Sequence, residues 1–554
     1  MQDHPKPSRP RGVPRTLPVP QTTLSYNLEV SARRYPTKTA LSYYGASLSY
    51  SELHRQVEAL AGYLQQYCHV QPGERVLLYM QNSPQFVIAC YAVLRADAVV
   101  VPVNPMNLTE ELAHYVQDAE TRVALVAQEL LARIAPLLGD ETLQQLIVAN
   151  YGEYADLASD LAQADFLRLP PLSDPPTGVL HWRNALAAQC APGAQTASSV
   201  DVCAMPYTSG TTGKPKGCMH THATLMANVA QTSVWRRWSA QDVMLAVVPF
   251  FHITGMVAVM HSAIYLGGEM VIMTRWDREA ALKLIARHQV TGWTNIPTMV
   301  IDLFASPHFK SDSLESLRIV VGGGVPMPEA VAKRLFDLTG VEYAEGYGLT
   351  ETASSTHSNP ADRPKRQCLG IPVCNTESLV IDPDTLAPLG VGEVGEIVSR
   401  GPQVFKGYWN NPAATAEAFI NIGGENYFRT GDLGRYDEDG YFFFVDRLKR
   451  MINASGFKVS PNEVESMMYA HPDIQDVCVI GSHDPYRGET VKAVVVLKAA
   501  SRDKLAAQDI VEWCKSRMAA YKYPHIVEFV DSLPKSGTGK VMWRQLQDEE
   551  RARA

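Results

Sequence analysis

The chain has 554 residues, more than one hydrophobic core usually supports, so we expect at least two domains. Hydrophobic residues make up 46% of the sequence and charged residues 19%, an ordinary composition for a globular protein. The formal net charge of -8 argues against nucleic acid as the main partner, because a polyphosphate backbone requires a basic surface. The cysteines are scattered without a CxxC pair, so we interpret them as reduced thiols in a cytoplasmic protein.

The first 23 residues are rich in proline and arginine, and we predict that residues 1–23 form a disordered arm. They contain no apolar stretch of signal-peptide length. The longest apolar region, residues 247–273, is interrupted by His252, His261 and Glu269. We therefore interpret it as a buried strand–turn–strand segment and expect no membrane span.

From Leu24 onward, helical and strand-like patterns alternate, which is typical of an α/β protein. Residues 50–66 have the periodicity of an amphipathic helix, and the apolar runs 74–82 and 98–104 are typical of buried strands around a helix. We predict a large α/β domain with mixed and parallel sheets over residues 24–446.

A second unit is predicted from Arg447 to the end of the sequence. Residues 460–463 (SPNE) form a capping box with proline at the first helical position. Two strand patterns, a helix around residues 510–518 and a further strand pattern follow. We predict a small α/β domain over residues 447–554.

Residues 207–217 (YTSGTTGKPKG) combine glycines, hydroxyls and two lysines between a predicted strand and a predicted helix. Glycine lets backbone amides approach phosphate oxygens, while Lys214 and Lys216 add positive charge. The spacing is not that of a P-loop NTPase, since Gly210 and Gly213 enclose only two residues and proline follows Lys214. The segment predicts a phosphate-binding loop of another type.

This loop resembles the signature of the adenylate-forming superfamily, which comprises acyl-CoA synthetases, luciferases and the adenylation domains of peptide synthetases. Further segments resemble that family's motifs in the family's order: PFFHITG (249–255), VGGGVPMP (321–328), EGYGLTET (345–352), YFRTGDLG (427–434), residues 445–465 and PKSGTGK (534–540). The resemblance spans residues 24–546 and is closest to fatty acid–CoA ligases. It implies a large AMP-binding domain of α/β layers and a small, mobile C-terminal domain.

The resemblance also implies a site for ATP. Tyr347 would offer a flat face to adenine, Asp432 would accept hydrogen bonds from the ribose hydroxyls, and Arg447 would contact ribose or phosphate. An ordinary interdomain salt bridge is the alternative for Arg447. The other ATP-binding residues that the resemblance implies are Thr208, Ser209, Gly210, Thr211, Thr212, Gly213, Lys214, Gly323, Gly324, Gly348 and Thr350.

The catalytic residues that the resemblance implies are Lys540, Thr350, Glu351 and His252. Thr350 would donate to the α-phosphate, and Glu351 would be a ligand for magnesium. His252 would line the route to the substrate carboxylate, with a buried structural histidine as the alternative. Lys540 would enter the site during adenylation and bridge carboxylate and phosphate.

Lys449 matches the family's hinge position. Rotation there would withdraw Lys540 and present residues 455–458 for thioester formation with coenzyme A. This implied coenzyme A segment consists of Ser455, Gly456, Phe457 and Lys458. Asn453 stands where luciferases tend to carry lysine, which favours an acyl-CoA synthetase. Because the sequence ends shortly after Lys540, we expect free coenzyme A as the acceptor.

No aspartate or glutamate occurs between Val247 and Gly268, so a substrate ammonium would find no partner there. Met256 and Trp293 are the expected centre of an acyl pocket for a hydrophobic tail. We expect a medium- to long-chain fatty acid. An aryl, alicyclic or thioether acid is the alternative, and a nucleotide-binding protein without catalysis is a further one. The sequence does not determine whether the protein forms a homodimer.

Overall fold

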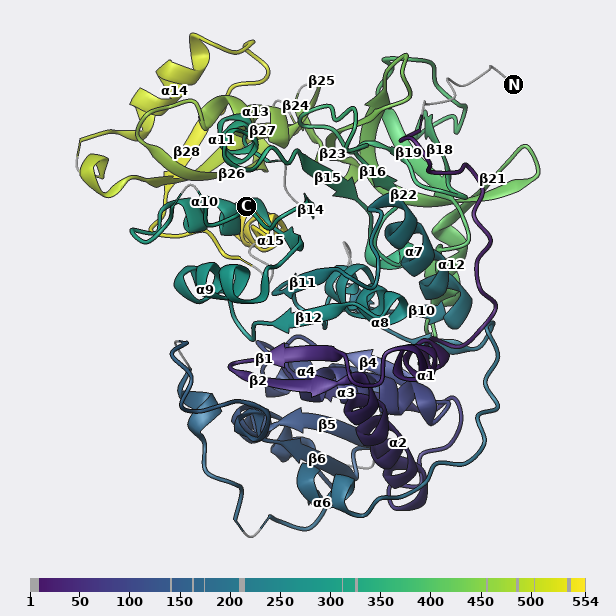
Figure 1. Ribbon diagram of the computed structural model, residues 1–554. Helices are drawn as coiled ribbons and strands as arrows, with labels where there is room; N and C mark the ends of the chain where they lie inside the picture. The colour runs from purple at the N-terminus through teal and green to yellow at the C-terminus, as the bar shows by residue number, and fades with distance from the viewer. Residues whose placement is uncertain are drawn as a thin grey trace.

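The computed structural model describes residues 9–139, 142–161, 164–173, 175–208, 215–310, 312–323, 327–454, 457–484, 488–502, 504–535 and 540–553. Its strands form two sheets of nine strands and two of five. In Figure 1, one nine-stranded sheet lies at the bottom and the other lies above it, while the two five-stranded sheets lie at the top. The predicted mixed α/β class is therefore confirmed.

The first nine-stranded sheet has the order β17-β16-β15-β14-β13-β11-β12-β1-β2. Its central strands pair in parallel, and antiparallel pairs form both edges. The carboxyl ends of β13, β14 and β15 thus meet at one edge, where α/β proteins bind ligands. The strands are β1 (Thr39–Tyr43), β2 (Ala46–Ser49), β11 (Val243–Ala246), β12 (Glu269–Ile272), β13 (Gly292–Asn295), β14 (Ile319–Gly323), β15 (Tyr343–Tyr347), β16 (His357–Ser358) and β17 (Ile371–Pro372).

The second nine-stranded sheet has the order β20-β10-β8-β4-β3-β5-β6-β7, with β9 paired to β10. The two predicted buried runs form its parallel strands β3 and β4. The strands are β3 (Arg75–Tyr79), β4 (Val99–Pro102), β5 (Val123–Ala127), β6 (Gln145–Ala149), β7 (Val179–His181), β8 (Val202–Ala204), β9 (Tyr207–Thr208), β10 (Lys216–Thr221) and β20 (Gly407–Tyr408).

The helices around these sheets follow from local signals in the sequence. The predicted amphipathic helix is α2 (Tyr50–Gln66), and Ser49 and Glu52 cap it reciprocally. Helix α3 (Pro84–Arg95) is apolar on all sides, and its residues are buried from Pro84 to Leu94. The other helices of this part are α1 (Leu24–Arg34), α4 (Thr109–Asp118), α5 (Leu131–Ile134), α6 (Trp182–Ala187), α7 (His222–Trp235), α8 (Ser262–Leu266), α9 (Arg278–His288), α10 (Pro297–Phe304) and α11 (Glu329–Thr339).

The apolar region 247–273 differs from the prediction. A π-helix, η5 (Thr254–His261), leads directly into α8, and only β12 is a strand. The strand–turn–strand interpretation was wrong because a fully buried run shows no periodicity that separates helix from strand. Along the described residues, no helix is both long and apolar enough to cross a bilayer.

Residues 9–23 also differ from the predicted disordered arm. They lie along the large domain, and Figure 1 shows them in purple running down to α1. Val13 is buried, the backbone N–H of Leu17 donates to Asn375 Oδ1 at 2.8 Å, and Arg9 Nη2 donates to the Val373 carbonyl at 3.3 Å. Apolar contacts and backbone hydrogen bonds far along the chain order this proline-rich segment.

A five-stranded antiparallel sheet follows, with β18 (Glu377–Ile381), β19 (Gly395–Arg400), β21 (Phe419–Ile422), β22 (Glu425–Tyr436) and β23 (Phe442–Arg447), and with helix α12 (Pro412–Glu417) beside it. Short helices connect the elements elsewhere: η1 (Gln128–Leu130), η2 (Ala135–Leu137), η3 (Tyr151–Tyr154), η4 (Asp165–Arg168), η6 (Thr350–Thr352), η7 (Leu448–Arg450) and η8 (Ala499–Ser501).

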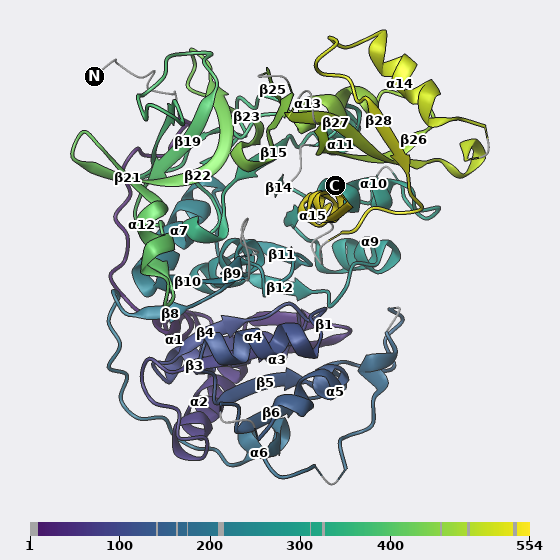
Figure 2. The same cartoon turned by 180° about the vertical axis from the view of Figure 1, so that it is seen from behind.

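The last sheet has a hydrophobic core of its own. Figure 2 shows it with α14 at the upper right. It consists of β24 (Ile452–Ala454), β25 (Phe457–Val459), β26 (Ile474–Asp484), β27 (Gly488–Leu497) and β28 (Ile526–Phe529), with α13 (Pro461–Met468), α14 (Ala507–Lys515) and α15 (Trp543–Arg553). The strands and helices expected in this region are confirmed, while the domain boundary at residues 446 and 447 stays a prediction. All nine cysteines are buried free thiols.

Candidate active site

Thr350 and Glu351 lie in the tight turn η6 directly after β15. The turn depends on Gly348, because a Cβ there would lie 1.3 Å from the Ser354 carbonyl oxygen. Ala353 and Ser354 have φ angles of 52° and 102°, values that side-chain-bearing residues rarely adopt. Backbone conformations of this kind cluster at functional sites.

His220, on β10, forms a hydrogen bond to this turn. Its Nε2 lies 2.7 Å from the carbonyl oxygen of Thr350, which can only accept a hydrogen bond. Burial lowers the pKa of His220 to about 4, so the ring is neutral and Nε2 carries the donated proton. The sequence prediction missed His220; the available signal was a single histidine inside an apolar strand next to the phosphate loop.

Glu351 is buried, and burial raises the pKa of its carboxyl group. The hydroxyl of Tyr408, on β20, donates to Glu351 Oε1 at 2.8 Å. Lys216 Nζ lies 5.0 Å from the centre of the Tyr408 ring. Since Tyr408 pairs with Cys218 of β10, it connects the strand after the phosphate loop to Glu351. Tyr408 was also missed, because nothing local marks it.

Glu351 suits a magnesium ion that is bound by one protein carboxylate and by the phosphates of the nucleotide. Within the described ranges, no group of three or more histidine, cysteine, aspartate or glutamate side chains is arranged to hold a metal. Magnesium in nucleotide sites is commonly held by one or two carboxylates together with substrate phosphates and water. The buried Glu351 carboxylate is linked through Tyr408 to β10, the strand that follows the predicted phosphate-binding loop, and it suits that arrangement.

Asp432, Tyr347 and Arg447 form one cluster. Asp432 is 1% exposed, and the Tyr347 hydroxyl donates to its Oδ2 at 2.6 Å. Arg447 Nε lies 2.9 Å from the other oxygen, Oδ1, because the two residues pair across β22 and β23. Burial raises the pKa of Asp432, and Arg447 opposes that shift. The aromatic face, the carboxylate and the guanidinium expected around a nucleoside thus lie together.

His252 and Lys540 are far apart in the sequence, yet the charge of Lys540 acts on His252. Burial, and next the charge of Lys540, lowers the pKa of His252 to about 4, so His252 is neutral. Burial and the Arg447 guanidinium lower the pKa of Lys540, whereas Asp432 raises it. Lys540 follows the last strand, β28, yet its charge acts on His252 and Asp432 of the large domain.

The phosphate loop connects the hairpin strands β9 and β10, and Thr208 pairs with Lys216 across it. The helix expected after this segment, near His222, is confirmed as α7, and strand β10 lies between the loop and that helix. The predicted residues outside the described part of the chain are Ser209, Gly210, Thr211, Thr212, Gly213, Lys214, Gly324, Ser455 and Gly456, together with the side chains of Phe457 and Lys458.

Of two further predicted residues, one ends a strand and the other lies in a short helix. Gly323 ends β14, and a Cβ there would lie 2.4 Å from the Gly346 carbonyl oxygen of β15, so glycine is needed for strand packing. Lys449 lies in η7, between the last two sheets. Burial, followed by the charges of Arg544 and Lys216, lowers the pKa of Lys449. Its role as a hinge stays a prediction.

Met256 and Trp293 are both fully buried. Trp293 stacks on Trp276 with ring centres 5.7 Å apart, and the Trp276 indole N–H donates to Asp302 of α10 at 2.8 Å. Trp293 therefore lies on the sheet face that α10 covers, where its packing is that of a core residue. Its role in an acyl pocket stays a prediction, as does that of Met256.

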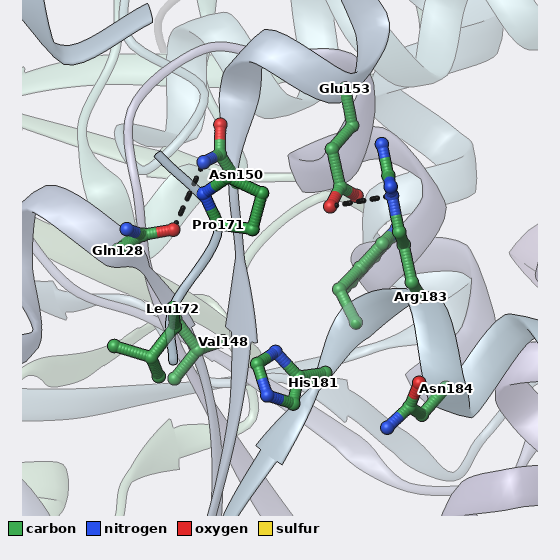
Figure 3. A pocket seen from close by; sticks show the side chains of 10 residues that line it. Gln128, Val148, Asn150, Glu153, Pro171, Leu172, His181, Arg183 and Asn184 are labelled. Atoms are coloured by element: carbon green, nitrogen blue, oxygen red, sulfur yellow. Dashed lines mark hydrogen bonds and ion pairs between the residues drawn. The ribbon is translucent and has the colours of Figure 1, made fainter. Parts of the chain in front are cut away.

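One cavity, of about 210 Å³, lies beside β6, β7 and α6, and its lining residues belong to none of the sequence motifs. Figure 3 shows that polar groups line it, including the Glu153–Arg183 ion pair, whose atoms lie 2.9 Å apart. A smaller cavity lies beside α7 and β16, and Ser355, which follows the turn with Thr350 and Glu351, lines it.

Comparison with known proteins agrees with this geometry. The AMP-binding enzyme family matches residues 28–409, and the AMP-binding enzyme C-terminal domain matches residues 463–540. The chain therefore belongs to the AMP-binding enzyme family, and within it to the adenylate-forming acyl-CoA ligases.

Individual relatives cover nearly the whole chain. A long-chain-fatty-acid–CoA ligase of Bacillus subtilis strain 168 is 34% identical over 98% of this chain and 97% of its own length. A feruloyl-CoA synthase of an Amycolatopsis species is 34% identical over 92% of this chain and 96% of its own. The crystal structure of ATP-bound MatB from Rhodopseudomonas palustris superposes with a TM-score of 0.83 at 27% identity, covering 96% and 99% of the two chains.

Proposed function

We propose that this chain is an ATP-dependent acid–thiol ligase that converts a carboxylic acid to its acyl-CoA through an acyl-adenylate. The observation that carries the proposal is the position of Lys540. It lies beyond the last sheet, yet its charge acts on His252 and Asp432 of the large domain. Adenylation brings a carboxylate and a phosphate together, and a positive charge positioned between them stabilises the transition state. Lys540 is placed to supply that charge.

In the first half-reaction, a carboxylate oxygen forms a bond to the α-phosphorus of ATP. The bond from that phosphorus to the bridging oxygen breaks, and pyrophosphate leaves. The Thr350 hydroxyl donates to an α-phosphate oxygen, and Lys540 offsets the negative charge where the two anions meet. His252, which is neutral, lines the route of the substrate carboxylate and adds no charge to it. The ATP-bound neighbour supports ATP as the nucleotide.

Glu351, together with the nucleotide phosphates, would hold a magnesium ion, which would supply charge neutralisation for the pyrophosphate. His220 and Tyr408 hold the turn and the carboxylate of Glu351 in place. Asp432 and Arg447 orient the ribose, and Tyr347 faces the adenine.

In the second half-reaction, the thiol of coenzyme A loses its proton to water and its sulfur forms a bond to the acyl carbon, while AMP leaves with the electrons of the broken carbon–oxygen bond. We propose that rotation at Lys449 withdraws Lys540 and presents residues 455–458 for this step. We place the reaction in the cytoplasm.

A medium- to long-chain fatty acid is the first candidate substrate, since curated relatives from several bacteria carry the name long-chain-fatty-acid–CoA ligase. An aryl acid is the second candidate, because a feruloyl-CoA synthase is equally identical to this chain.

Pyrophosphate release over a panel of alkyl and aryl acids tests the proposal. ATP, magnesium and coenzyme A are supplied, and each acyl-CoA product is identified by mass. We expect acid-dependent pyrophosphate release with AMP and acyl-CoA in equal amounts. ATP binding without release for any acid would instead support a nucleotide-binding protein without catalysis.

A further inference from the structure

Helix α4 contacts the hairpin of β9 and β10, which carries the phosphate loop. Across this hairpin, Thr208 pairs with Lys216 and Tyr207 pairs with Gly217. Strand β9 has only two residues, and among the described strands it pairs with β10 alone. So short a hairpin is marginally stable by itself. The positions of Thr208 and Lys216 therefore depend on further contacts, and α4 provides them.

Tyr207, at the start of the hairpin, is bound by the last residue of α4. The Tyr207 hydroxyl donates to Asp118 Oδ2 at 2.6 Å. Its ring also meets the Tyr115 ring edge to face, with ring centres 4.8 Å apart. Burial, followed by the hydrogen bond to Asp118, raises the pKa of Tyr207, so the hydroxyl keeps its proton and remains a donor at neutral pH. A short bond from a hydroxyl to a carboxylate is among the stronger hydrogen bonds in proteins.

Pro215, at the other end of the loop, is bound by the same helix. His114 Nε2 lies 2.9 Å from the Pro215 carbonyl oxygen, and Nε2 carries the proton because a carbonyl can only accept. His114 and Asp118 are four residues apart, so they lie on the same face of α4. One turn of a single helix thus contacts the chain on both sides of the loop, and Pro215 is directly followed by Lys216.

Trp409 connects the end of α4 to the turn that carries Glu351. The Trp409 indole N–H donates to the Asp118 carbonyl at 2.9 Å, and its backbone N–H donates to the Gly217 carbonyl at 2.8 Å. Trp409 directly follows Tyr408, whose hydroxyl donates to Glu351. Asp118 is therefore joined to the hairpin by its carboxylate and to the strand that carries Tyr408 by its backbone carbonyl.

Fixing both ends of the phosphate loop has a consequence for binding. Glycine loses more conformational freedom on ordering than any other residue, and residues 207–217 contain three glycines. A segment whose ends are already fixed has less freedom left to lose when the ligand arrives. The contacts made by α4 should therefore strengthen the binding of a nucleotide without touching it.

We infer that His114 and Asp118 are positioning residues for ATP, which hold the hairpin on both sides of the phosphate loop in the arrangement that accepts the nucleotide phosphates. The inference rests on the proposed ligase function and adds α4 to the parts of the chain that determine nucleotide affinity. His114 acts through the Pro215 carbonyl, and Asp118 acts through the Tyr207 hydroxyl.

Variants that remove or retain one hydrogen bond test the inference. Tyr207→Phe removes the hydroxyl and keeps the ring, while Asp118→Asn keeps an acceptor for that hydroxyl. His114→Leu removes the donor to Pro215, while His114→Gln keeps an N–H that can reach the same carbonyl. Gln117→Ala is the matched control, because this residue of the same helix is exposed.

Each protein is measured in three ways. Calorimetry gives the Kd of α,β-methylene-ATP with magnesium, an analogue that cannot release pyrophosphate. Steady-state pyrophosphate release gives kcat and separate KM values for ATP, the acid and coenzyme A. A urea titration gives the stability, so that a loss of folding is recognised independently of nucleotide binding.

We expect Tyr207→Phe and His114→Leu each to raise the Kd of the analogue and the KM for ATP by about 3- to 10-fold, the size of one lost hydrogen bond. The KM values for the acid and for coenzyme A should not change, and kcat at saturating ATP should be retained. Asp118→Asn and His114→Gln should recover most of the affinity, and Gln117→Ala should behave as the wild type.

Two outcomes would overturn the inference. A Kd of the analogue that stays at the wild-type value in both Tyr207→Phe and His114→Leu would make the contacts purely structural, whatever the change in the urea midpoint. Equal rises in the KM for ATP, the acid and coenzyme A would also exclude a positioning role for ATP. If His114→Leu does not fold, Tyr207→Phe decides, since it removes a single oxygen atom. No pyrophosphate release with any acid would overturn the ligase proposal, whereas the Kd of the analogue would still decide the role of α4.

Discussion

Replacing Lys540 by alanine separates the two half-reactions. Lys540 has a pKa lowered by burial and by Arg447, and its charge acts on Asp432 and His252. A charge placed where the transition state becomes more negative contributes about 2.7–4 kcal/mol, which corresponds to a rate factor of about 10²–10³. Arg447 repels Lys540 in the resting protein, so removal of the lysine should not weaken ATP binding.

The adenylation step is measured as single-turnover pyrophosphate release, and thioester formation is measured with a supplied acyl-adenylate and coenzyme A. We expect Lys540→Ala to slow the first by about 10²–10³ and to leave the second near the wild-type rate. Lys535→Ala is the matched control, because this lysine of the same segment is exposed and pairs with Asp476 at 2.7 Å. We expect it to change neither rate.

Equal losses in both half-reactions would refute the reasoning, since Lys540 would then serve both arrangements of the small domain. A loss of less than tenfold in adenylation would also refute it, because the lysine would lie outside the reacting groups. An increase in the KM for ATP as large as the fall in rate would assign Lys540 to nucleotide binding.

Three further predictions follow from buried groups. Glu351→Gln keeps an acceptor for the Tyr408 hydroxyl but weakens the metal ligand, so a magnesium titration should show a higher requirement and slower pyrophosphate release; an unchanged titration removes Glu351 from the metal site. Trp293→Ala should lower the free energy of unfolding by about 3–5 kcal/mol in urea, as for a core aromatic residue. A longer preferred acid at unchanged stability would assign Trp293 to the acyl pocket instead. Burial lowers the pKa of His220, His222 and His252 from 6.5 to about 4, so the unfolded chain takes up protons first as pH falls. Each should lower the stability by about 1.4 kcal/mol per pH unit between these values, and a urea midpoint that stays constant from pH 7 to about pH 4.5 would contradict this.

Local patterns in the sequence determined much of the fold. The bounds of α2 follow from its apolar periodicity and from the reciprocal cap of Ser49 and Glu52, which are contacts within one helical turn. The buried strands β3 and β4 follow from continuous apolar runs. The motif residues Asp432, Tyr347 and Arg447 could be assigned to one site because their segments resemble those of a family, and the structure brings them together.

Tertiary structure decided what no local pattern encodes. The apolar run around Met256 became a π-helix because burial on all sides removes the periodicity that separates helix from strand. Residues 9–23 became ordered through Val373 and Asn375, more than 350 positions away, where composition alone indicated disorder. His220 and Tyr408 acquired their roles from single hydrogen bonds to the turn at Thr350 and Glu351. A hydrogen bond between distant segments depends on which residues the fold places opposite each other, and sequence spacing carries no record of that placement.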